Sequence, residues 1–136
     1  MTGAADAKAT VLVVDDEAPL RRVLERALSR LGYRVIGAGS AESALDLLTT
    51  ERPHAILLDV HLPTMSGLAF YVAALARWPE LEGCVAVMTG DGESAEVLEW
   101  IARNSCPLIA KPFNLDQIAE WLHHVRAWRD RRAEQA

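Results

Sequence analysis

Short apolar runs alternate with amphipathic segments along this chain. The runs at residues 10–14 (TVLVV) and 55–58 (AILL) lack polar alternation, which is typical of strands buried on both faces of a sheet. Between them, residues 20–31 carry Leu, Val and Ala at helical spacing, with Pro19 in the first turn and Gly32 at the end. This pattern predicts a strand, an acidic loop and a helix.

The strand-then-helix pattern repeats along the rest of the chain. We expect further strands at residues 34–36, 84–88 and 108–110, and further helices at residues 40–50, 66–78, 93–103 and from Asn114 or Leu115 into the C-terminal segment. Such alternation implies right-handed crossovers and a parallel sheet with helices on both faces. Five units fit an α/β, doubly wound, flavodoxin-like fold with strand order 2-1-3-4-5.

Length and composition indicate one domain. The 136 residues are enough to bury a core. We expect a flexible leader at residues 1–8, a main domain at residues 9–127, and a basic tail or linker start at residues 128–136. The N-terminus lacks a signal-peptide pattern, and no apolar stretch approaches the roughly 20 residues of a membrane span. These features predict a cytoplasmic protein.

Charge and cysteine content exclude two classes of function. The net charge of −5 argues against nucleic-acid binding, because phosphate contacts need clustered Lys and Arg. Cys84 and Cys106 are too few for a disulfide framework and lack metal-ligand spacing. We interpret them as small buried hydrophobic residues, with a redox role as the weaker alternative.

Polar residues follow four of the five predicted strands. Asp15 and Asp16 follow the first strand, Asp59 the third, Thr89 the fourth and Lys111 the fifth. The carboxyl ends of parallel strands meet at one edge of the sheet, so we expect these side chains to converge. A lone Asp after a strand is usually a turn or a helix cap, but four such features together favour a functional site.

The residue types in this predicted site suit phosphoryl chemistry. Three carboxylates in one pocket repel one another, and a cation relieves that repulsion. Oxygen ligands with water and phosphate suit Mg²⁺. Lys111 and Thr89 would pair with phosphoryl oxygens, and an aspartate is an established nucleophile toward phosphorus.

Four segments resemble the receiver domains of two-component response regulators: VLVVDDE, ILLDVHLPTMSGL, VAVMTG and KPF, within residues 10–125. The resemblance implies that Asp59 accepts a phosphoryl group from a sensor histidine kinase or a histidine phosphotransfer protein. It implies that Asp16 and Asp59 bind Mg²⁺ directly and that Asp15 acts mainly through water. The backbone carbonyl of His61 would be a further ligand.

The resemblance assigns further roles around the acceptor. Thr89 and Lys111 would bind phosphoryl oxygens, and the Lys111–Pro112 peptide bond would be cis. His61 and Asp91 occupy positions that border the aspartyl phosphate in the family. We favour the interpretation of the His61 side chain as a solvated loop residue, since it need not contact the metal.

The chain also departs from the family pattern. Leu108 stands where many receivers carry Tyr or Phe, three residues before the lysine, so we expect any signal to the partner face to travel by another route. Leucine here resembles receivers that are attached to kinases or stand alone. Asn104 and Ser105 replace a frequent Gly-Ala pair, and Asn104 is expected to tolerate a left-handed turn.

Two tryptophans suggest a protein interface. Trp100 and Trp121 are expected on neighbouring helices, where they form either a docking or homodimer surface or edge packing of large rings. By resemblance, the first helix, with Arg21, Arg22 and Arg26, faces the kinase. No nucleic-acid or membrane partner is expected.

Other functional classes fit the residues less well. An aspartate-dependent phosphohydrolase would need Asp-x-Asp spacing after the first strand, and a mononucleotide-binding module would need a Gly-rich loop there. The complete acidic, Thr and Lys set argues against a scaffold that no longer takes phosphate. We therefore predict a Mg²⁺-dependent switch that catalyses only its own phosphoryl transfer and dephosphorylation, either stand-alone or excised from a longer regulator.

Overall fold

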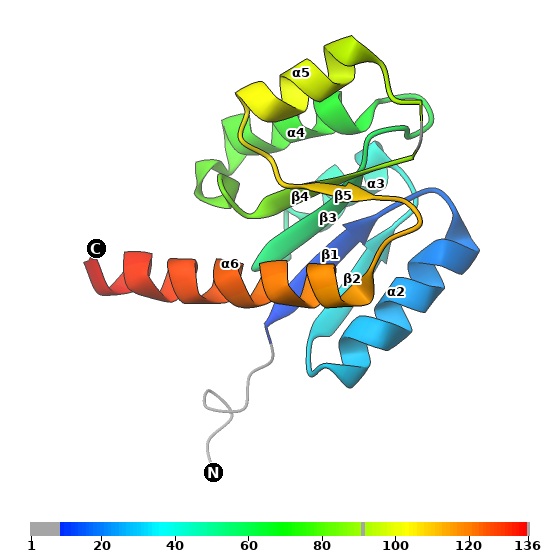
Figure 1. Ribbon diagram of the computed structural model, residues 1–136. Coiled ribbons are helices and arrows are strands. Elements are labelled where there is room, and N and C mark those ends of the chain that lie inside the picture. Colours follow the sequence, from blue (N-terminus) through cyan, green and yellow to red (C-terminus); the bar gives the residue numbers. More distant parts are fainter. Residues whose placement is uncertain (1–8, 91, 136) are drawn as a thin grey trace.

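A five-stranded parallel sheet in the order β2-β1-β3-β4-β5 forms the centre of the molecule (Figure 1). The computed structural model describes residues 9–90 and 92–135, so the predicted leader at residues 1–8 lies outside the described part. The strands are β1 (Thr10–Val14), β2 (Arg34–Ala38), β3 (Ala55–Asp59), β4 (Val85–Thr89) and β5 (Leu108–Ala110). The predicted fold class and strand order are confirmed.

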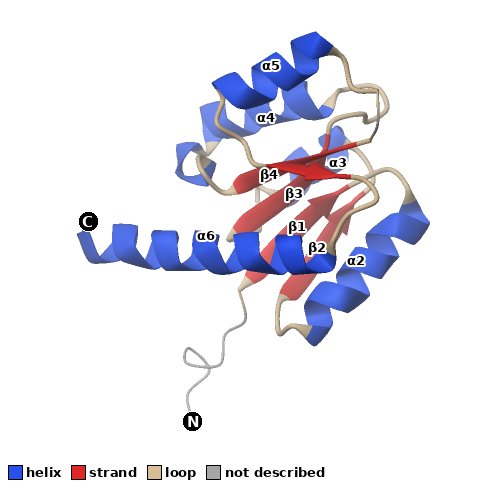
Figure 2. Ribbon diagram, in the orientation of Figure 1, coloured by secondary structure: helices blue, strands red, loops and turns tan. Residues whose placement is uncertain are grey.

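Helices cover both faces of this sheet (Figure 2). They are α2 (Ala18–Arg30), α3 (Ala41–Leu47), α4 (Gly67–Arg77), α5 (Ala95–Arg103) and α6 (Leu115–Gln135), with a short 3₁₀ turn, η1 (Pro79–Leu81). Helices α2 and α6 lie on one face, and α3 and α4 lie on the other, with α5 beside α4 (Figure 1). This arrangement leaves the carboxyl ends of the strands open for a site.

The central strands are apolar throughout because both of their faces are buried. In β1, Val11 and Val13 join the cluster under α2 and α6, whereas Leu12 and Val14 join the cluster under α3 and α4. Successive side chains of a strand point to opposite faces, so an unbroken apolar run serves two cores. Each fully buried Leu or Val contributes about 1.5–3 kcal/mol of burial free energy.

Local capping sets several element ends that differ from the predicted ones by a few residues. Ser40, Ser66 and Ser94 each accept a hydrogen bond from a backbone N–H in the first turn of α3, α4 and α5. Helix α5 therefore begins at Ala95 rather than at Glu93. Helix α3 ends at Leu47, because the next residues form a turn instead of the predicted continuation to residue 50.

Helix α6 runs through residue 127 without a break. Trp128 packs against the core under α2 and α6, and the Arg129 guanidinium donates a 3.0 Å hydrogen bond to the Pro53 carbonyl. Residues 128–135 of the segment that we named a tail are therefore helical, and Trp128 and Arg129 contact the domain. Whether residues 128–136 also begin a linker stays a prediction.

Two smaller expectations concern turns and cysteines. The left-handed residue before β5 is Ser105, with φ of 54°, whereas Asn104 has φ of −93°, so the expectation for Asn104 was wrong by one position. Cys84 is buried, Cys106 is partly buried, and both are free thiols. Across residues 9–90 and 92–135, none of the helices combines the length and apolar character that crossing a bilayer demands.

Candidate functional site

The ends of three strands bring carboxylates and one lysine together. Asp15 directly follows β1, Asp59 is the last residue of β3, and Lys111 directly follows β5. Lys111 Nζ donates a 3.0 Å hydrogen bond to Asp15 Oδ2 and a 3.1 Å hydrogen bond to Asp59 Oδ2. Asp15 is fully buried and Asp59 nearly so. The structure thus brings together three of the five residues that the strand ends predicted.

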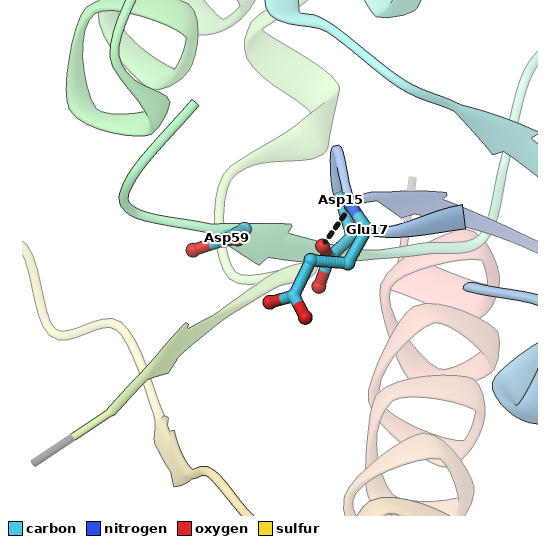
Figure 3. Close-up of side chains that lie close together, drawn as sticks. All are labelled: Asp15, Glu17 and Asp59. Atoms are coloured by element: carbon cyan, nitrogen blue, oxygen red, sulfur yellow. Dashed lines mark hydrogen bonds between the residues drawn. The ribbon is translucent and has the colours of Figure 1, made fainter. Parts of the chain in front are cut away.

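Glu17 is a third carboxylate of this site, and sequence reasoning missed it. One carboxylate oxygen from each of Asp15, Glu17 and Asp59 lies within 4.8 Å of the other two (Figure 3). Glu17 has extended backbone angles, and residues two apart in extended chain point to the same side, so this spacing was the available signal. Asp16, between them, is exposed and outside this group. Its role as a direct metal ligand stays a prediction.

The peptide units around Asp15 are held on both sides. The Asp15 N–H donates to the Ala38 carbonyl over 3.0 Å, and Arg21 Nη1 donates to the Asp15 carbonyl over 2.7 Å. The Arg21 side chain lies across Gly37, where an added Cβ would stand 3.1 Å from Arg21 Cδ. The Glu17 N–H also donates to Asp15 Oδ1 over 2.9 Å, the bond drawn in Figure 3.

The loop after Asp59 returns tightly over the acceptor. The His61 N–H donates to Asp59 Oδ1 over 3.0 Å, so each carboxylate oxygen of Asp59 has a donor. The Gly67 N–H donates to the Val60 carbonyl over 2.9 Å, and a Cβ at Gly67 would stand only 2.1 Å from the Asp59 carbonyl oxygen. Close backbone approach therefore explains the glycine at the start of α4.

Burial and opposing charges shape the titration of the site. Burial raises the pKa of Asp59, the Asp15 carboxylate adds to the rise, and the His61 N–H and Lys111 oppose it. Burial alone would lower the pKa of Lys111, but its hydrogen bonds to Asp15 and Asp59 outweigh burial and leave that pKa raised. Lys111 is therefore a cation at neutral pH.

The donor set fits a hard divalent cation. Three carboxylates face one ammonium, which leaves excess negative charge at the strand ends. All three candidate ligands are oxygen donors, the type that Mg²⁺ prefers, whereas softer metals favour His and Cys. Asp15, Glu17 and Asp59 are thus suited to hold Mg²⁺.

A family model for the response regulator receiver domain matches residues 11–123. The chain belongs to the response-regulator receiver family. It is similar to sporulation initiation phosphotransferase F of Bacillus subtilis (strain 168), with 32% identity over 112 residues that cover 81% of this chain and 87% of that protein. It is also similar to the probable transcriptional regulator ycf27 of Cyanophora paradoxa, at 33% identity over 107 residues, 79% of this chain. The match spans only 44% of that regulator's length.

Solved receiver structures share the fold. The chemotaxis protein CheY4 of Vibrio cholerae superposes with a TM-score of 0.77 at 27% identity, covering 88% of this chain and 99% of that chain. A response regulator receiver protein from Pseudomonas putida has a TM-score of 0.80 at 26% identity, covering 87% and 98%. NtrX from Brucella abortus matches at 31% identity with a TM-score of 0.77, covering 90% of this chain and 28% of that chain.

The remaining predicted residues of the receiver site lie on the neighbouring strand ends and loops. Thr89 ends β4 and is buried, and its carbonyl accepts a 2.7 Å hydrogen bond from the Lys111 N–H. The Lys111–Pro112 peptide bond is cis, as the resemblance implied. The His61 side chain is exposed, but its Nε2 donates a 2.8 Å hydrogen bond to Glu93, a partner that the sequence did not reveal. Asp91 lies outside the described residues.

The receiver's two candidate interface tryptophans are not brought together. Trp100 packs edge to face against Tyr71, with ring centroids 5.1 Å apart, and joins the clusters under α4 and α5. Trp121 packs on the opposite face of the sheet, against the core under α2 and α6. The two rings therefore pack against different cores, in the way that the edge-packing alternative expects. A docking or homodimer surface that uses both rings stays a prediction.

Proposed function

We propose that this receiver accepts a phosphoryl group on Asp59 from the phosphohistidine of a sensor histidine kinase or a histidine phosphotransfer protein. One observation carries the proposal: the Asp59 carboxylate ends a central strand, 3.1 Å from Lys111 Nζ, within a cluster of three carboxylates. The Bacillus subtilis relative is named a phosphotransferase, which supports this chemistry. Phosphorylation then switches the binding of a partner.

The proposed transfer is a single displacement at phosphorus. A carboxylate oxygen of Asp59 attacks, the new O–P bond forms, and the P–N bond to the donor imidazole breaks. The departing imidazole nitrogen keeps the electron pair and takes a proton. Lys111, a point charge held at the acceptor, pairs with a phosphoryl oxygen, and the Thr89 hydroxyl donates to another.

Mg²⁺ is the proposed cofactor of this transfer. Asp15, Glu17 and Asp59 would hold it, together with the Asp16 side chain and the His61 carbonyl implied by the family. When bound, Mg²⁺ supplies positive charge that stabilises the transferring phosphoryl group. The residues of this chain meanwhile orient the acceptor through the His61 N–H and the Lys111 ammonium.

The proposed protein acts on itself and does not turn over an exogenous substrate. Its catalytic steps are its own phosphorylation and the hydrolysis of its own acyl phosphate. We place it in the cytoplasm, where kinases of this type present their phosphohistidine. Multiple-turnover hydrolysis of a free phosphate ester would contradict this assignment.

Intact mass spectrometry after incubation with acetyl phosphate and Mg²⁺ tests the proposal. We expect one phosphoryl adduct on the wild type, none on Asp59→Asn, and none when EDTA replaces Mg²⁺. Thr10→Ser, at the far end of β1, serves as a matched control that keeps the adduct. An adduct on Asp59→Asn would overturn the acceptor assignment. If the wild type forms no adduct and also does not bind beryllofluoride, the protein is a scaffold-type receiver.

A further inference from the structure

A chain of hydrogen bonds links Asp59 to the N-terminus of α5. The His61 N–H donates to Asp59 Oδ1 over 3.0 Å, and His61 Nε2 donates to Glu93 Oε1 over 2.8 Å. The other oxygen of Glu93 accepts from the Ser94 N–H over 3.2 Å. Ser94 is the N-cap of α5, and its hydroxyl accepts from the Val97 N–H. One continuous path therefore joins the acceptor to the first turn of this helix.

The burial of Glu93 separates this contact from an ordinary surface ion pair. The Glu93 side chain is 6% exposed, although that of His61 is 70% exposed. A covered carboxylate needs polar partners, and those the structure gives it are His61 Nε2 and the Ser94 N–H. The pair of His124 and Glu120 on α6 differs, because both side chains are more than two-thirds exposed and 3.8 Å apart.

The loop that carries Glu93 is built to turn at this point. Gly92 has φ of 80°, a left-handed conformation that side chains rarely adopt, and an added Cβ there would meet nothing within 4 Å. The positive φ of the backbone, and not a close contact, therefore requires glycine at this position. Glu93 follows directly and reaches His61 from the loop after β4.

The usual aromatic route has no ring in this chain. Leu108 occupies the position three residues before Lys111 and is 41% exposed. A branched aliphatic side chain cannot accept or donate a hydrogen bond, so it carries no polar link between the site and its surroundings. Any polar link between the site and its surroundings must therefore use other residues.

We propose that His61 and Glu93 are positioning residues that couple the state of Asp59 to α5. The proposal rests on phosphorylation of Asp59. A phosphoryl group adds acceptor oxygens beside the His61 N–H, and the imidazole passes the resulting shift of this loop to Glu93 and the α5 N-cap. The half-buried Trp100 and the exposed Leu98 lie on α5, so a partner that binds this helix would read the change.

Hydrogen exchange of α5 peptides, with and without Mg²⁺ and beryllofluoride, tests the coupling, and the acetyl phosphate adduct is measured in parallel. We expect exchange in α5 to change in the wild type. Glu93→Ala should keep the adduct but reduce the α5 change at least about twofold. His61→Ala should reduce the α5 change as strongly, and the double variant should be no worse than either single variant. Glu93→Gln, which keeps an acceptor for His61 Nε2, should retain part of the response.

Glu120→Ala, which breaks the exposed pair on α6, is the matched control and should respond like the wild type. An α5 response in Glu93→Ala or His61→Ala that equals the wild-type response would overturn the coupling. So would a wild type that forms the adduct without any change in α5. A wild type that forms no adduct would instead overturn the proposed function.

Discussion

Arg21 Nη1 donates a 2.7 Å hydrogen bond to the carbonyl oxygen of Asp15, the fully buried carboxylate of the acidic cluster. The Asp15 N–H is held from the other side by the Ala38 carbonyl, so the backbone of this residue is fixed at both peptide units. The cluster therefore depends on an arginine that contributes no ligand atom of its own.

Removing this support should weaken Mg²⁺ binding. In Arg21→Gln we expect a loss of affinity of about tenfold, because outer partners of metal ligands typically have effects of this size. Calorimetric titration of the protein with Mg²⁺ measures it. Arg22→Gln changes the exposed neighbour on the same helix and should bind as the wild type does. Equal affinities in the two variants would contradict the role of Arg21.

Neutralising the acceptor should stabilise the metal-free protein. Burial raises the pKa of Asp59 above its ordinary value of 3.8, so the folded state binds this proton more tightly than the unfolded state does. The ionised Asp59 carboxylate therefore lowers the free energy of unfolding at pH values above the pKa of the folded state. This destabilisation disappears as the pH falls toward 3.8, the ordinary value. In urea unfolding with EDTA at pH 7.5, Asp59→Asn should have the higher midpoint.

Added Mg²⁺ should narrow the difference in urea midpoint between Asp59→Asn and the wild type. An ion that binds only the folded state stabilises it by about 2.7 kcal/mol at a concentration 100 times its Kd. Because Asp59→Asn lacks one carboxylate, it should gain less from Mg²⁺ than the wild type. A variant less stable than the wild type in EDTA would refute the direction of the shift.

Removal of the Lys111 side-chain charge should destabilise the metal-free protein, whereas neutralising Asp59 should stabilise it. Lys111→Met leaves the buried carboxylates of Asp15 and Asp59 without their cation, which typically costs about 3 kcal/mol. We expect a lower urea midpoint in EDTA and a larger recovery on addition of Mg²⁺ than in the wild type. Glu17→Gln, at an exposed member of the cluster, should change the EDTA midpoint little.

A methyl group at Gly67 should distort the site. The added Cβ would lie 2.1 Å from the Asp59 carbonyl oxygen, so the loop after β3 must shift. Gly67→Ala should lower the free energy of unfolding by about 1–3 kcal/mol and reduce the phosphoryl adduct in acetyl phosphate assays. Gly90→Ala, where a Cβ meets nothing within 4 Å, is the control and should retain both properties. Similar behaviour of the two variants would contradict the close approach.

His54 should contribute to the pH dependence of stability far from the site. Its Nδ1 accepts a 3.0 Å hydrogen bond from the Thr10 N–H, and burial together with the charges of Arg129 and Arg126 lowers its pKa. The folded state therefore holds this proton less tightly than the unfolded state, and stability falls as the pH drops below about 6.5.

Urea unfolding at pH 7.5 and pH 5.5 measures this contribution. His54→Asn, which keeps an acceptor for the Thr10 N–H, should lose less stability than the wild type between the two pH values. His123→Asn, at an exposed histidine of α6, is the control for the loss of an imidazole. An unchanged pH difference in His54→Asn would rule out the contribution of this histidine.

Most of the fold was predictable from local patterns. Apolar runs such as residues 10–14 and 55–58 identify buried strands, and the handedness of the crossovers limits how they can be ordered. Because parallel strands end at one edge, Asp15, Asp59 and Lys111 could be assigned to one site before any contact was known. These features follow from periodicity and chain connectivity, which the sequence by itself determines.

Tertiary structure alone decided which side chains meet. Glu17 joins Asp15 and Asp59 in the cluster, and Glu93 reaches His61 across two loops. Trp100 and Trp121 pack against cores on opposite faces of the sheet. Each outcome depends on the direction of one side chain or on packing between residues far apart in sequence. Such contacts depend on how whole elements pack in three dimensions, and no local pattern of apolar and polar positions encodes that packing.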